Sequence, residues 1–194
     1  MTIRQTWFVT GAASRLGADI VRQALAAGHR VVAADADPLA VLQRAGDIAH
    51  ARLLALRLDE VDTRETSAAV KCAVAHFGGI DVLVHGAADC SPQAEFDAPV
   101  ARRDFSASVR ALFNVTRGVL GAMREQGAGR ILHLVPAPDK ARGPTLFSIT
   151  GFCRSVAADV AAFGIEVTAV PAHQAAALLR SASGSDRDEV LEQA

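Results

Sequence analysis

The sequence has little of several residue types that define particular classes of protein. Its three cysteines, Cys72, Cys90 and Cys153, are scattered and form no Cys-x-x-Cys pair, which argues against a disulfide framework or a zinc cage. It has no run of about 18 apolar residues, and its first residues lack the apolar core of a signal peptide. The 20 basic residues are spread along the chain, so no nucleic-acid partner is expected. We therefore expect a soluble, cytoplasmic protein without a membrane partner.

What is present is a regular alternation of apolar runs and helical patterns. The apolar runs predict strands at residues 6–10, 30–34, 53–58, 80–84, 131–135 and 167–170. Such alternation is typical of an α/β fold, here a three-layer, Rossmann-type parallel sheet of about six strands with helices on both faces. We interpret residues 1–194 as a single domain with a short or poorly ordered tail at 174–194.

Two of the predicted helices have marked beginnings. Asp37 is a capping residue and is followed by Pro38, the residue best suited to the first helical position. Asp62 and Glu65 have the spacing of a capping box at the start of the next helix.

A candidate nucleotide site lies in TGAASRLG, residues 10–17, between the first strand and the first helix. Gly11 and Gly17 flank a turn that would let the backbone approach a pyrophosphate, and the helix start offers free N–H groups to the anion. This glycine pattern alone also suits a plain strand–helix turn. Asp35, roughly 20 residues further on, is placed to bind the adenosine ribose and to repel a 2′-phosphate. Together these features predict a dinucleotide-binding fold.

From residue 6 to residue 171 the chain resembles the short-chain dehydrogenase/reductase family. TGAASRLG is similar to its T-G-x-x-x-G-x-G motif with Arg15 in place of the middle glycine, and RLDEVD resembles the segment whose acid, here Asp59, lies by the adenine ring. GGIDVLVHGAAD resembles the strand that ends in N-N-A-G, while FNVTRGVLGAM, GRILHLV and GIEVTAVPAH resemble the fourth helix and the fifth and sixth strands. The resemblance implies an NAD cofactor bound by Gly11, Ser14, Arg15, Leu16, Gly17, Asp35, Leu58, Asp59 and Ala87.

The resemblance fails at the catalytic residues. The family uses a Tyr as acid/base together with a Lys, a Ser and an Asn, but this sequence contains no tyrosine. The Asn position falls on Ser108 and the Ser position on Pro136, and the Tyr and Lys positions fall near Arg142 and Leu146. Arg142 cannot replace the acid, because a guanidinium is not deprotonated in proteins.

Three other side chains, Lys140, His133 and His173, are candidate proton donors. We favour a plainer interpretation of each: a solvated loop charge, a hydrogen-bonded strand histidine and an exposed residue after the sixth strand. His85 is placed to face His133 across neighbouring strands, but without the third ligand that a metal site needs. Nothing adjacent to Cys90 argues for a lowered thiol pKa.

The nicotinamide side of the family's site is altered as well. Ala172-His173 follows Pro171 where the family has glycine, and few residues remain after it. We therefore expect a truncated substrate region and a pocket open to water, which weakens the electrostatics of hydride transfer.

The sequence thus predicts a degenerate family member that binds NAD(H) and serves as a non-catalytic or regulatory subunit. An active NAD-dependent oxidoreductase that acts on a carbonyl or alcohol with a non-standard acid is the alternative, and a remnant without a selected role is a second one. Arg15 either crowds the pyrophosphate or adds a charge-assisted contact to it. We favour crowding, because the family's glycine permits close approach.

The fourth and fifth helices each show two apolar faces. In the fourth helix a second stripe lies beside the first and leaves Asn114 among the few polar positions, and the fifth helix has a face of small residues. The family dimerises through these helices. We therefore expect a homodimer, or a heterodimer with another chain of this fold, through the second stripe Ala111, Val115, Val119 and Ala122 and the face Phe147, Gly151, Ala158 and Ala162.

Overall fold

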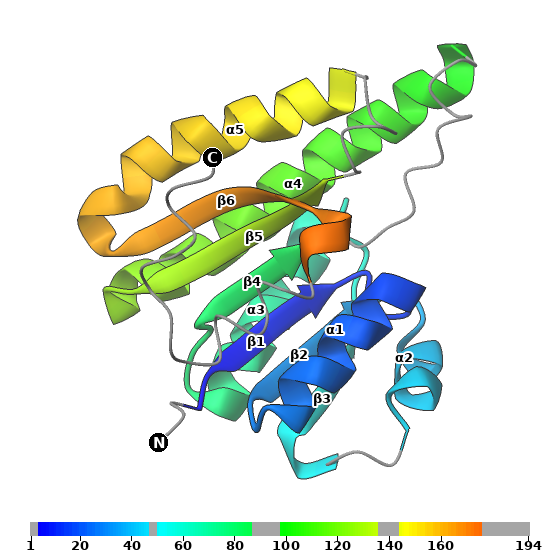
Figure 1. Ribbon diagram of the computed structural model, residues 1–194, viewed down its shortest axis with the longest axis vertical. Helices are drawn as coiled ribbons and strands as arrows, with labels where there is room; N and C mark the ends of the chain where they lie inside the picture. The colour runs from blue at the N-terminus through cyan, green and yellow to red at the C-terminus, as the bar shows by residue number, and fades with distance from the viewer. Residues whose placement is uncertain (1–3, 47–49, 87–97, 136–143, 176–194) are drawn as a thin grey trace.

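The computed structural model describes residues 4–46, 50–86, 98–135 and 144–175, and it confirms the predicted α/β fold (Figure 1). A six-stranded sheet has the order β3-β2-β1-β4-β5-β6, and all five strand pairs are parallel. The strands are β1 (Thr6–Thr10), β2 (Arg30–Asp35), β3 (Leu53–Arg57), β4 (Val82–His85), β5 (Gly129–Val135) and β6 (Ile165–Pro171). The helices are α1 (Arg15–Ala26), α2 (Pro38–Ala45), α3 (Thr63–Phe77), α4 (Ala98–Gln126) and α5 (Pro144–Val160), with short turns η1 (His50–Arg52), η3 (Ala161–Phe163) and η4 (Ala172–Gln174).

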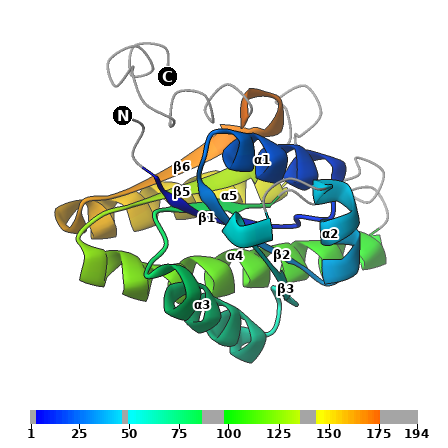
Figure 2. The ribbon, with the colours of Figure 1, turned by 90° about the horizontal axis from the view of Figure 1, so that it is seen from below.

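Two layers of helices enclose the sheet (Figure 2). Alternate residues of β1 point to opposite faces, as the period of a strand requires. Trp7 and Val9 pack with α1 and α2, whereas Phe8 packs with α3, α4 and α5. The central strands are buried on both faces, which explains why they read as continuous apolar runs.

The predicted helix starts are confirmed, with one difference in detail. The Asp37 carboxylate accepts from the N–H groups of Leu39 and Ala40, with Pro38 in the first position of α2. Asp62 likewise caps α3. Glu65, however, does not complete a capping box with Asp62.

The Glu65 side chain instead fastens the loop that follows β3. Its carboxylate accepts a hydrogen bond of 2.8 Å from the N–H of Asp59, and it also binds the guanidinium of Arg57. The start of α3 is thereby tied to the end of β3, next to the predicted adenine contact.

Several strand limits differ from the predicted ones. β4 begins at Val82 rather than at residue 80, because the backbone of Ile80 is hydrogen-bonded on both sides by the Gln126 side chain. β5 and β6 each begin two residues earlier than predicted, where Gly129 pairs with Ile165. The early part of β6 alternates buried and exposed residues, so its hydrophobic signal is weak at that end.

The prediction that the second apolar stripe of α4 forms an association surface was wrong. Val115 and Val119 are fully buried, because α4 packs on the sheet and also against α3 and α5. The exposed small face of α5 is confirmed by Gly151 and Ala158. Among the α4 side chains that the structure describes, residues 106–126, Phe113 is a large apolar one that is exposed, with 54% of its surface accessible.

Candidate functional site

The turn between β1 and α1 has the geometry that the glycine pattern predicted. Gly11 has a positive φ of 62°, and its carbonyl accepts a hydrogen bond from the N–H of Ser14. Ser14 is the N-cap of α1, and its Oγ accepts from the N–H of Gly17 at 2.9 Å. A Cβ on Gly17 would lie 2.2 Å from the carbonyl oxygen of Gly11, so only glycine allows this closeness of helix and turn.

Arg15 occupies the position of the missing glycine without backbone strain. It is the first residue of α1 in the structure, and its side chain is exposed. The next residue, Leu16, is half-buried against the core beneath the helix. The guanidinium therefore projects from the end of α1 that carries free N–H groups and the positive end of the helix dipole. Any effect of Arg15 on a phosphate must come from its side chain.

Asp35 holds the turn from the end of β2. Its Oδ2 accepts a hydrogen bond of 2.9 Å from the N–H of Ala13, and its Oδ1 accepts one of 3.1 Å from the N–H of Asp37. The carboxylate is only half-buried, so a face of it remains accessible. The predicted ribose ligand thus lies against the predicted phosphate turn, which is the arrangement that a dinucleotide requires.

The loop of residues 58–62 lies at the same edge of the sheet. The N–H of Leu58 donates to the Asp35 carbonyl oxygen at 2.9 Å, and the Leu58 side chain is buried in the core. Asp59 is exposed, as a contact to adenine would need. Ala87, the remaining predicted cofactor residue, lies outside the described residues. The other predicted residues are brought together along one edge, and their glycines and free N–H groups fit a dinucleotide.

A buried polar cluster, which the sequence only partly predicted, lies at the carboxyl end of β4. His85 Nδ1 lies 3.2 Å from His133 Nδ1 on the neighbouring strand, as expected from their register. His133 Nε2 lies 3.2 Å from Thr116 Oγ1 in α4, and His85 Nε2 lies 3.2 Å from Glu60 Oε2 in the loop after β3. Sequence reasoning missed Glu60 and Thr116, because no periodicity links a loop and a helix to these strands.

Burial and charge set the protonation of this cluster. Burial, with a smaller effect from His85, lowers the pKa of His133 well below its ordinary value. Burial acts to raise the pKa of Glu60, but its hydrogen bond and charge interaction with His85 outweigh this and lower it. Near neutral pH, His133 is therefore neutral and Glu60 is ionised.

Asn114 is a further residue whose role the sequence did not predict. Helical spacing placed it on the solvent side of α4, but it is half-buried and clamps the loop after β3. Its Nδ2 donates to the carbonyl oxygens of Glu60 and Val61 at 3.1 and 2.9 Å, and its Oδ1 accepts from Thr63 Oγ1. This clamp fixes the loop that carries Asp59.

The structure describes two of the three candidate proton donors, and these two lie in different environments. His133 is 1% exposed and lies inside the fold, which confirms the prediction of a hydrogen-bonded strand histidine. His173 is exposed in η4, and Ser108 is half-buried in α4. Within the described ranges, no three His, Cys, Asp or Glu side chains are grouped as a metal ion needs. Four predicted positions lie outside the described residues: Cys90, Pro136, Lys140 and Arg142.

Comparison with known proteins agrees with this geometry. Residues 5–183 match the family described as short chain dehydrogenase. The chain belongs to this family. Members of this family typically bind a nicotinamide dinucleotide.

Individual relatives extend the comparison. The chain is 30% identical to an oxidoreductase of Botryotinia fuckeliana over 84% of its own length and 62% of the relative's, so it spans less than two thirds of that protein. It is 29% identical to the 2-dehydro-3-deoxy-L-rhamnonate dehydrogenase (NAD(+)) of a Sphingomonas species, with coverage of 84% and 68%. A short-chain dehydrogenase structure from Streptomyces avermitilis superposes with a TM-score of 0.75 at 27% identity, covering 88% of this chain and 66% of the other.

Among the helices that the structure describes, none is long and apolar enough to cross a membrane.

Proposed function

We propose that this chain is an NAD(H)-binding short-chain dehydrogenase domain that acts as a non-catalytic or regulatory subunit. The observation that carries the cofactor assignment is the position of Asp35, hydrogen-bonded to the turn at Ala13 with part of its carboxylate accessible. A 2′-phosphate in that place would meet a negative charge, whereas ribose hydroxyls would meet an acceptor. The name of the Sphingomonas relative, which specifies NAD(+), supports the same choice.

The proposal of a non-catalytic role rests on proton transfer. Reduction of a carbonyl needs an acid with a pKa near the working pH within reach of the forming alkoxide. The chain contains no tyrosine, and the His133 side chain is only 1% exposed, so it is closed to a molecule that enters from solvent. The second candidate is an active oxidoreductase with a non-standard acid, which the relatives' names as oxidoreductases and dehydrogenases favour.

A thermal-shift comparison tests the cofactor assignment. NADH at about 100 times its dissociation constant adds roughly 2.7 kcal/mol to the free energy of unfolding, and NADPH at equal concentration should add less. Asp35→Asn removes the charge and should reduce the difference between the two cofactors. Equal shifts in the wild-type protein, or a larger one with NADPH, would overturn the assignment.

A turnover assay distinguishes the two candidates. We expect no NADH oxidation above background with ketones, aldehydes or quinones, because acid–base help alone is typically worth 10² to 10⁴ in rate, about 3–5 kcal/mol. Steady turnover that scales with protein concentration would establish the active oxidoreductase instead. A protein that binds neither cofactor would support the remnant without a selected role.

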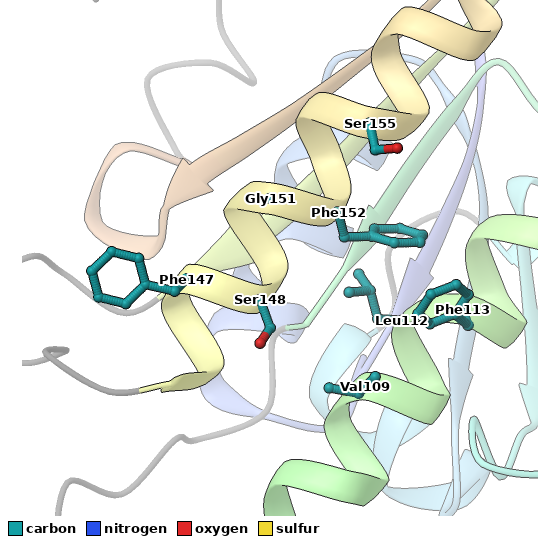
Figure 3. Close-up of a pocket in the computed structure, with 8 residues that line it drawn as sticks. All are labelled: Val109, Leu112, Phe113, Phe147, Ser148, Gly151, Phe152 and Ser155. Carbon is teal, nitrogen blue, oxygen red and sulfur yellow. The ribbon is translucent and has the colours of Figure 1, made fainter.

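We further propose that α4 and α5 form an interface with a second copy of this chain. A groove of about 460 Å³ lies between the two helices, and Figure 3 shows the side chains that line it. Phe147 at its rim is 78% exposed and Phe113 is 54% exposed, so two aromatic side chains of the groove present apolar surface to water. The lining is Val109, Leu112, Phe113, Phe147, Ser148, Gly151, Phe152 and Ser155.

Light scattering at micromolar concentration tests this interface. We expect a dimer that Ala158→Glu dissociates, because Ala158 lies on the exposed face of α5. Ala75→Glu on the exposed side of α3 is the matched control and should leave the dimer intact. A wild-type monomer would exclude the homodimer, and capture of an intact family member by that monomer would assign the surface to a heterodimer.

A further inference from the structure

A cationic side chain lies beside the proposed ribose ligand. The strand β3 lies next to β2 in the sheet (Figure 1). Arg57 at the end of β3 is the register partner of Asp35, and its side chain is 65% exposed. Neighbouring strands are about 5 Å apart, which is less than the length of an extended arginine side chain. The Arg57 guanidinium can therefore reach the place where a 2′-phosphate beside Asp35 would lie.

This guanidinium is already bound by an acid. Arg57 Nη1 donates to Glu65 Oε1 at 2.7 Å, so the two side chains form an ion pair. The other oxygen of the same carboxylate, Oε2, accepts from the N–H of Asp59 at 2.8 Å. Glu65 also lies in the first turn of α3, where the helix dipole favours a negative charge. Because both of its oxygens are bound, the carboxylate is fixed in its place beside Arg57.

The ion pair changes the charge that a 2′-phosphate would meet. A phosphate monoester carries a charge of about −1.5 to −2 near pH 7. An unpaired arginine binds such a group well, because its planar fork donates two parallel hydrogen bonds to the phosphate oxygens. Paired with Glu65, the Arg57 guanidinium adds no net charge, and the Asp35 carboxylate beside it is negative. The three side chains together therefore repel a phosphate.

We propose that Glu65 is a specificity-determining residue, which disfavours NADPH by binding Arg57, the cation that would otherwise attract the 2′-phosphate. Asp35 repels this phosphate directly, whereas Glu65 withholds a favourable contact from it. The inference rests on the proposed binding of NAD(H) and adds a second determinant of the choice between the two dinucleotides. Loss of the Glu65 charge then makes Arg57 a phosphate ligand.

The second contact of Glu65 offers a plainer role, that of holding the loop after β3. Its hydrogen bond to the N–H of Asp59 positions the segment that is predicted to lie by the adenine ring. Adenine is common to NADH and NADPH, so loss of this contact alone would weaken the binding of both to the same extent. The ratio of the two dissociation constants therefore separates the specificity role from the structural one.

The variant Glu65→Gln separates the two contacts. The glutamine carbonyl oxygen can still accept from the N–H of Asp59, but its NH₂ group cannot accept from Arg57. The Glu65 side chain is 32% exposed, so the new amide stays in contact with water and the fold is retained. Arg57→Gln and the double variant Arg57→Gln/Glu65→Gln complete a double-mutant cycle, which measures the coupling of the two side chains.

Calorimetric titration of these proteins with NADH and with NADPH at low ionic strength tests the proposal. In Glu65→Gln we expect the ratio of the NADPH to the NADH dissociation constant to fall by at least about threefold, because an unpaired guanidinium attracts the 2′-phosphate. In the double variant the ratio should return to within about twofold of the wild-type value, since the charge of the pair is again zero. High salt should reduce the gain in Glu65→Gln, because it screens exposed charges.

Glu166→Gln is the matched control. Glu166 and Arg130 are also register partners on neighbouring strands, and they form another exposed ion pair with an N–O distance of 2.9 Å. This pair lies near the beginnings of β5 and β6, whereas Asp35 and Arg57 lie at the ends of their strands. Because all strands are parallel, the control pair lies at the opposite edge of the sheet. Its loss should leave both dissociation constants unchanged.

The outcomes separate this inference from the proposed function. An unchanged ratio in Glu65→Gln, or an equal loss of affinity for both dinucleotides, would overturn the specificity role of Glu65 and leave NADH binding in place. The same gain for NADPH in the double variant would show that Arg57 does not bind the phosphate, which overturns the inference as well. A wild-type protein that binds neither dinucleotide would overturn the proposed function, and the inference with it.

Discussion

Replacing Gly17 by alanine adds a single methyl group at the tightest point of the turn between β1 and α1. The new Cβ would lie 2.2 Å from the Gly11 carbonyl oxygen and 2.9 Å from the Ala12 Cα, and all of these neighbours are backbone atoms. Relief to 3.0 Å, below which Cβ contacts are essentially never found, requires a shift of 3.0 − 2.2 = 0.8 Å in the turn or the helix. No side chain can rotate away to provide it.

Overpacking of this kind costs about 1–3 kcal/mol, which at this chain length lowers the melting temperature by about 3–10 °C. The same shift separates the N–H groups at the start of α1 from the place of the phosphates, so NADH binding should weaken as well. Differential scanning calorimetry and NADH titration measure the two effects.

Gly121→Ala provides the control within the same chain. Gly121 lies in α4 with no atom within 4 Å of the added Cβ, so alanine should stabilise the helix by about 0.5–1 kcal/mol. The turn geometry would be refuted by a Gly17→Ala protein that melts at or above the wild-type temperature and binds NADH equally well.

Three further predictions concern other parts of the site. Burial keeps His133 neutral, because it lowers the pKa of this side chain well below the ordinary value of 6.5. The free energy of unfolding should therefore fall as the pH drops below about 6.5, by at most about 1.4 kcal/mol per pH unit. In urea titrations at several pH values, His133→Asn should reduce this slope. Asn114→Ala should cost about 1–3 kcal/mol by freeing the carbonyl oxygens of Glu60 and Val61, with weaker NADH binding by calorimetry; unchanged binding would show that the clamp does not position the loop. Arg15→Gly should tighten NADH binding if the side chain crowds the pyrophosphate, whereas weaker binding of this variant would make Arg15 a phosphate ligand.

The sequence correctly predicted the features that depend on residues close together in the chain. Buried parallel strands read as apolar runs, and capping at Asp37 and Asp62 follows from neighbours within three residues. The closeness of Asp35 to the turn followed from the fixed order of strands in this fold.

The errors came from contacts between elements far apart in the chain. Val115 was predicted to lie at the surface because helical periodicity shows how many apolar faces a helix has. It does not show which neighbouring helices cover those faces, and here α3 and α5 cover them. No sequence pattern marks the contacts of Asn114 and Thr116. The partner of Asn114 lies in the loop after β3, and the partner of Thr116 lies on β5. Such pairs become visible only when the sheet order brings them together.

Isothermal titration of the wild-type protein with NADH and, separately, with NADPH tests the central claim most directly. NADH should bind at a single saturable site, and NADPH should bind more weakly because its 2′-phosphate would face the Asp35 carboxylate. Asp35→Asn should narrow this difference. Tighter binding of NADPH, or no binding of either dinucleotide, would contradict the account of this chain as an NAD(H)-binding protein.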